Sequence, residues 1–71
     1  MSGGLSITQC KMARVGLGLG VRDLAELADV SPNTITRFER GEKLQPRTIK
    51  AIKEALEGKG AKFSEDGGVK V

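Results

Sequence analysis

The sequence predicts a mostly α-helical domain of four short helices that ends in a small β-hairpin. Apolar residues recur at helical spacing in four segments, and glycine or proline separates these segments. The last eleven residues instead alternate apolar with polar side chains around a turn-forming stretch. A length of 71 residues leaves room for one small hydrophobic core.

The composition argues against several kinds of chemistry. The chain has no His and a single Cys, so it lacks the usual nitrogen and sulfur ligands of a zinc site. A Ser or Cys nucleophile would have no imidazole to activate it. We therefore expect no enzyme activity, no metal, no cofactor and no small-molecule ligand. Cys10 cannot form a disulfide within the chain, and no apolar run reaches the roughly 18 residues of a membrane span. These features favour a cytoplasmic protein without a membrane contact.

The first helix is predicted from Ile7 to about Gly16, after a flexible N-terminus at residues 1–5. Ser6 and Gln9 have capping-box spacing, in which each side chain satisfies a backbone N–H at a helix start. Glycines then end the helix because they make its continuation costly. The expected apolar stripe consists of Ile7, Cys10, Ala13 and Leu17.

The next two helices have the outline of a helix-turn-helix at residues 21–40. One helix is predicted over Val21–Ala28. Ser31 is the expected N-cap of the other, and Pro32 its first residue, where a missing N–H costs nothing. That helix extends to about Arg40.

A fourth helix is predicted from Pro46 to Gly58, which closes a domain at residues 6–58. Its expected buried residues are Ile49, Ile52, Ala55 and Leu56. Residues 59–71 are predicted to form a hairpin, with a disordered tail as the alternative.

Positive charge is concentrated on the third helix and the segment after it. The net charge of the chain is +3, and residues 37–53 carry six basic side chains against two acidic ones. The basic residues are Arg37, Arg40, Lys43, Arg47, Lys50 and Lys53. This distribution indicates a surface that faces phosphates, although a basic face that is merely solvated is the alternative.

The third helix also carries side chains that suit base edges. Asn can bond adenine, Arg can bond guanine, and the Thr methyl can contact the thymine methyl. These residues are Asn33, Thr34, Thr36 and Arg37, beside a rigid Pro32, and an inert surface is the alternative reading. Arg14 and Glu39 lie beside apolar stripes, where an unpaired charge is unfavourable. We expect them to form an ion pair, with two partly exposed chains as the alternative.

The segment from Leu17 to Gly41 resembles the Cro/repressor-type (XRE) helix-turn-helix family of phages and bacteria. It contains the pattern L-A-x-x-A-x-V-S-x-x-T-I-x-x-F-E-x-G, and the likeness extends from Ser6 to the end of the fourth helix. The resemblance implies a compact four-helix, lambda-repressor-like domain. It also implies a nucleoid-associated protein that binds double-stranded DNA, usually as a homodimer on an inverted repeat.

The resemblance also implies roles for individual residues. The base-reading positions match Pro32, Asn33, Thr34, Thr36 and Arg37, although Pro32 stands where a polar reader is common. The positions that reach phosphates or the minor groove match Gly20, Val21, Arg22, Arg40, Lys43 and Arg47. Gly20 and Val21 replace a polar cap and a Gln, which leaves only backbone N–H groups and the helix dipole for that contact. Arg14 and Glu39 match a buried ion pair of the family.

The tail resembles that of the Cro branch, where C-terminal strands pair across a dimer. An isolated hairpin is marginal in water, so Phe63, Val69 and Val71 need a cover. A second copy would supply it and would place two recognition helices about 34 Å apart; folding onto the chain's own helices would leave a monomer. The sequence thus predicts a dimeric transcriptional repressor, with an antitoxin-like autoregulator and an architectural module as alternatives.

Overall fold

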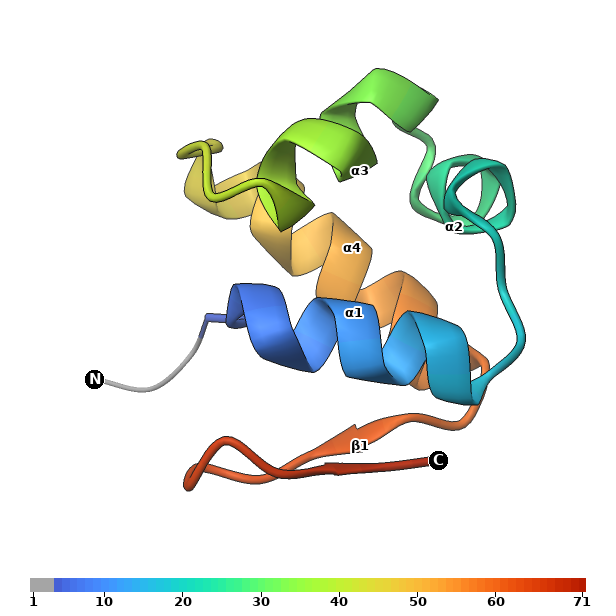
Figure 1. Ribbon diagram of the computed structural model, residues 1–71, viewed down its shortest axis with the longest axis vertical. Helices are drawn as coiled ribbons and strands as arrows, with labels where there is room; N and C mark the ends of the chain where they lie inside the picture. Colours follow the sequence, from blue (N-terminus) through green and yellow to red (C-terminus); the bar gives the residue numbers. More distant parts are fainter. Residues whose placement is uncertain (1–3) are drawn as a thin grey trace.

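The computed structural model describes residues 4–71, and it contains the predicted four helices and the C-terminal hairpin (Figure 1). The helices are α1 (Ile7–Gly16), α2 (Val21–Ala28), α3 (Pro32–Glu39) and α4 (Pro46–Gly58). The strands β1 (Lys62–Phe63) and β2 (Val69–Lys70) pair antiparallel, with Lys62 opposite Lys70 and Phe63 opposite Val69. The fold class predicted from the sequence is confirmed. The third helix ends one residue earlier than predicted, at Glu39.

All four helices end in the same backbone motif. A residue with positive φ follows the last turn, and the next residue donates its N–H to the carbonyl five positions back, as in a Schellman motif. The residues with positive φ are Gly18, Asp29, Gly41 and Gly60. The donors that follow them are Leu19, Val30, Glu42 and Ala61, with N–H···O distances of 2.9, 2.9, 3.0 and 3.1 Å. The motif fixes where each chain segment leaves its helix.

The core lies where α1, α2, α3 and α4 meet. Its fully buried large side chains are Leu24, Ile35, Ile52, Leu56 and Cys10. Leu5 also belongs to it, with 5% of its surface exposed, although residues 1–5 were expected to be flexible. Residues 1–3 of that segment lie outside the described residues. Ile7 was expected on the apolar stripe of α1 but is 39% exposed. Within residues 4–71, no helix has the length and apolar character that a bilayer crossing requires.

The hairpin lies against α1, on the side of the molecule away from α3 (Figure 1). Gln9 joins the two: its side-chain NH₂ donates to the carbonyls of Ser64 and Gly68, each at 3.3 Å. The oxygen of the same side-chain amide accepts the Ser6 N–H at 3.0 Å, so Gln9 caps α1 and holds the hairpin together. Phe63 and Val69 are half-buried against the chain's own core. The helices of the same chain therefore supply a cover for them.

Candidate nucleic-acid interface

One side of α3 packs into the protein, and the opposite side faces solvent. The helix starts at Ser31, whose hydroxyl accepts the Thr34 N–H at 3.2 Å, and Pro32 occupies its first position. Ile35 and Phe38 are 0% and 4% exposed, and they anchor the inner side on the core. Because both anchors lie on one side, the positions between them must point outward.

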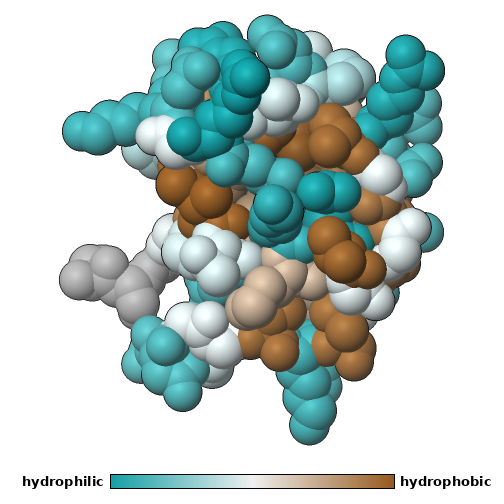
Figure 2. All heavy atoms as spheres, viewed as in Figure 1, coloured by the Kyte–Doolittle hydropathy of each residue, from teal (hydrophilic) through white to brown (hydrophobic). Residues whose placement is uncertain are grey.

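The outward side of α3 presents four exposed residues at helical spacing. Asn33, Thr36, Arg37 and Arg40 stand at positions i, i+3, i+4 and i+7, and all four are exposed. Pro32 is exposed beside them at the start of the helix. Figure 2 shows hydrophilic atoms over this upper part of the molecule. The face therefore offers amide and guanidinium groups from a rigid helix.

The two threonines of α3 use their hydroxyls locally. The Thr34 hydroxyl lies 2.9 Å from that of Ser31, and Thr34 is half-buried. The Thr36 hydroxyl donates to the Pro32 carbonyl at 3.2 Å, although the residue is exposed. Of the five predicted base readers, Thr34 is thus the least accessible. Thr36 offers its methyl group more readily than its hydroxyl.

Arg37 forms an exposed ion pair with a residue beyond the end of its helix. Its Nε donates to Oε1 of Glu42 at 2.8 Å, and the two side chains are 49% and 48% exposed. The turn at Gly41 brings Glu42 back beside the last turn of α3, because the Glu42 N–H bonds the Arg37 carbonyl at 3.0 Å.

Three exposed cations flank the outward face of α3. Arg40 caps the helix, Lys43 lies in the loop that follows, and Arg47 stands in the first turn of α4. The Arg47 Nε donates to the side-chain oxygen of Gln45 at 3.0 Å, which orients the guanidinium. Together they give this end of the molecule the positive charge that a phosphate backbone attracts.

The start of α2 offers fewer groups for a phosphate contact than the sequence predicted. The Gly20 N–H donates to Oδ2 of Asp23 at 2.8 Å, so this backbone donor already has a partner within the chain. Val21 is half-buried against the core, whereas Arg22 is exposed. The capping role of Asp23 was not predicted from the sequence. The spacing of three residues from Gly20 to Asp23 was the available signal.

Below α3, the structure brings Arg14 and Glu39 together. Arg14 Nε and Nη2 donate to the two carboxylate oxygens at 2.8 and 3.0 Å, and the side chains are 13% and 11% exposed. The hydrogen bond that Arg14 donates to the Glu39 carboxylate raises the pKa of Arg14 above its usual value. Burial, aided by the negative charge of Glu39, raises the pKa of the neighbouring Cys10 thiol to about 12. The pair joins α1 to the end of α3.

A comparison with protein families agrees with this geometry. The model of the helix-turn-helix family matches residues 11–63, which include α2, the turn, α3 and the cations beyond it. The chain belongs to the Cro/repressor-type helix-turn-helix family. It is a DNA-binding helix-turn-helix regulator. A search of curated proteins gives no significant match.

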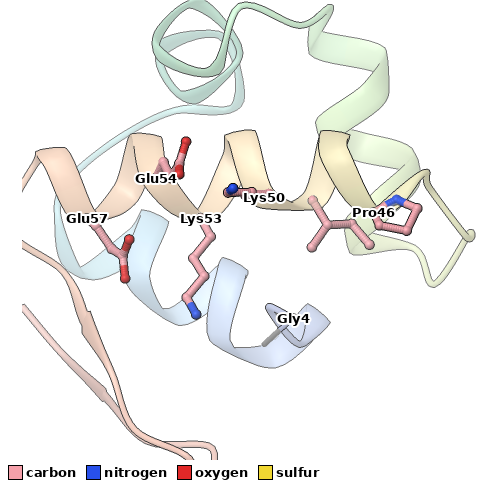
Figure 3. Close-up of a pocket in the computed structure, with 7 residues that line it drawn as sticks. Gly4, Pro46, Lys50, Lys53, Glu54 and Glu57 are labelled. Atoms are coloured by element: carbon pink, nitrogen blue, oxygen red, sulfur yellow. The ribbon is translucent and has the colours of Figure 1, made fainter. Parts of the chain in front are cut away.

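Two of the six basic residues lie away from the recognition helix of the helix-turn-helix. Lys50 and Lys53 line a hollow of about 460 Å³ along α4, next to Gly4 (Figure 3). Glu54 and Glu57 line the same hollow, and Lys53 extends toward the start of α1. Lysines and glutamates are balanced there, so this surface has no excess of positive charge. The cationic surface is therefore narrower than the sequence suggested.

Proposed function

We propose that this protein is a transcriptional repressor that binds an inverted-repeat operator as a dimer, with α3 in the major groove. One observation carries the proposal: the exposed side of α3 carries Asn33 and Arg37 beside a cluster of exposed cations. An amide that bonds adenine and a guanidinium that bonds guanine are the common direct readers of the major groove. A rigid helix presents both of them.

Two sets of residues have different roles in this proposed complex. Asn33, Thr36 and Arg37 select the base sequence, while Thr34 positions the start of the helix and Pro32 contacts a sugar or a thymine methyl. Arg40, Lys43 and Arg47 bind phosphates or reach the minor groove, and their contribution falls with salt. At the start of α2, the exposed Arg22 takes the largest share of the phosphate contact, because the Gly20 N–H has a partner within the chain. The free amides of that first turn and the helix dipole supply the rest.

The proposed dimer uses the hairpin. Val71 is 59% exposed at the end of the chain and lies close to Gly16 of α1, a helix that also exposes Met12 and Val15. The chain's own helices already cover Phe63 and Val69 in part. These two residues therefore contribute less than Val71 to the proposed contact with a second copy. A two-stranded hairpin has unpaired edges, and pairing across a twofold axis would satisfy the backbone groups there.

Selection of duplexes from a random pool tests the function directly. The purified full chain should enrich one sequence whose two halves are related by a twofold axis, with half-site centres about one helical turn apart. A scrambled duplex of the same length is the control, and it should bind more weakly by a factor of about 10³ or more. Enrichment of no sequence would refute sequence-specific regulation and favour the architectural module.

A further inference from the structure

The end of α3 differs from the ends of the other three helices in the type of residue that follows the positive φ. All four helices share the Schellman motif, and the residue after the positive φ normally packs against the last turn of its helix through an apolar contact. That residue is Leu19 after α1, Val30 after α2 and Ala61 after α4, and each is buried or half-buried. After α3 it is Glu42, which is exposed. A charged side chain therefore stands where the motif usually places an apolar one.

Glu42 uses this position to contact Arg37. The motif bonds the Glu42 N–H to the Arg37 carbonyl at 3.0 Å, and the carboxylate Oε1 accepts from Arg37 Nε at 2.8 Å. Both side chains are about half exposed, and exposed ion pairs contribute little to folding stability. A contribution to folding stability therefore does not explain why residue 42 carries a carboxylate. A carboxylate on a surface that binds DNA also repels phosphates, so its presence there calls for a different explanation.

The contact leaves the outer edge of the guanidinium open. Arg has five N–H donors in a planar fork, and Glu42 engages the one on Nε. The two terminal Nη groups have no hydrogen-bond partner among residues 4–71. Guanine presents O6 and N7 as adjacent acceptors in the major groove, and two parallel N–H groups match them. A guanidinium that is held at Nε can present both Nη groups together.

We infer that Glu42 positions Arg37 for guanine and so determines the sequence specificity of the site, an inference that rests on the proposed function. An Arg side chain loses rotamer freedom when it binds, and a partner that orders it beforehand removes part of this loss. The benefit applies only where Arg37 meets its base, whereas the repulsion of phosphates applies to every duplex. Glu42 thus lowers affinity for all DNA and raises the preference for the correct site.

The test compares three variants of the full chain on the selected duplex and on one with the contacted guanine replaced. Glu42→Ala removes the contact and the charge. Glu42→Gln removes the charge but keeps an oxygen that accepts from Nε. Glu57→Ala removes one negative charge from the hollow on α4 and serves as the matched control. Thermal melting of each variant checks that the fold is intact, and the NMR signal of Arg37 Nε–H reports the contact without DNA.

Glu42→Ala should lower the ratio of the two affinities by about 2- to 10-fold, the factor that ordering one such side chain supplies. Its affinity for the replaced duplex should rise, and the Nε–H signal should broaden. Glu42→Gln should keep more of the ratio than Glu42→Ala, and Glu57→Ala should keep all of it.

A uniform gain in affinity for both duplexes, with an unchanged ratio in both Glu42 variants, would overturn the inference. An Arg37→Ala variant that discriminates as well as the wild type would also overturn it, even if the protein selects an operator. Failure of the wild type to select any sequence would instead refute the proposed function itself.

Discussion

At the scale of single residues, the contact between Arg14 and Glu39 stabilises this small chain. Both side chains are nearly buried, and two hydrogen bonds join them. Glu39→Ala should lower the free energy of unfolding by about 3–5 kcal/mol, because it leaves a buried guanidinium without a counter-charge. Urea denaturation followed by circular dichroism measures the change.

Two further variants separate this effect from a general loss of charge. Glu57→Ala removes the same charge from an exposed residue and should stay within about 0.5 kcal/mol of the wild type. The double variant Arg14→Met with Glu39→Leu should recover most of the stability, since apolar residues can replace a buried pair. An unfolding free energy of Glu39→Ala within 1 kcal/mol of the wild type, by the same rough scale, would contradict the account.

Arg37 and Lys43 separate base reading from phosphate binding. Arg37→Ala should weaken the selected duplex by about 1–3 kcal/mol and relax the preference at one base pair. Lys43→Ala should weaken all duplexes alike and reduce the dependence of affinity on salt. Fluorescence anisotropy at several salt concentrations, with selected and random duplexes, distinguishes the two. Equal losses on both duplexes for both variants would contradict this division.

At the scale of elements, the end of α3 depends on the backbone of Gly41. Its φ is +99°, a conformation that a residue with a Cβ rarely adopts. Gly41→Ala should therefore destabilise the protein by about 1–2 kcal/mol. The added methyl meets only Ile7 Cδ1, at 3.9 Å, so crowding does not contribute.

Gly58→Ala is the matched control, and it should change stability in the opposite direction. Gly58 is the last residue of α4, and its added methyl would have no neighbour within 4 Å. Ala is the better helix former, so Gly58→Ala should stabilise by about 0.5 kcal/mol. Thermal melting of both variants gives the comparison, and a stabilising Gly41→Ala would contradict the reading of the turn.

The local features of the elements could be predicted from the sequence. Ser6, Ser31, Pro32 and Pro46 mark helix starts through chemistry that acts within one turn. Features that depend on backbone angles or on distant contacts could not be predicted. Asp29 adopts a positive φ where the sequence suggests only a brief connection. The bonds from Gln9 to the hairpin join residues more than fifty positions apart.

The candidate site was predicted as a set of residue types, and the structure distinguishes their exposure. The sequence predicted Asn33, Thr34, Thr36 and Arg37 together on the outward side, and the structure exposes all of them except Thr34. The half-buried state of Thr34 depends on the Ser31 cap. Lys53 was also predicted to belong to the cationic surface, although its side chain lies over the hollow near α1. The sequence could not show this, because charge along a chain does not reveal which helix face carries it.

At the scale of the whole molecule, the proposed dimer depends on the end of the hairpin. Val71→Asp should shift the protein toward monomer in sedimentation equilibrium, because the substitution places a charge at the proposed contact. The fold should persist, since Val71 is 59% exposed. Leu27→Asp is the matched control, because Leu27 is 43% exposed on α2, and it should leave association unchanged. A wild type that stays monomeric at all concentrations and binds its duplex one to one would contradict the dimer.

The recognition helix with its neighbouring cations lies on the opposite side of the molecule from the hairpin, so one titration can show which of the two surfaces meets DNA (Figure 1). NMR spectra of the labelled full chain, recorded as the selected duplex is added, test this most directly. If α3 enters the major groove, the largest shifts should occur in the side chains of Asn33 and Arg37 and in the backbone of residues 31–37. Shifts confined to the outer face of α1 around Met12 and Val15, with α3 unchanged, would contradict this placement.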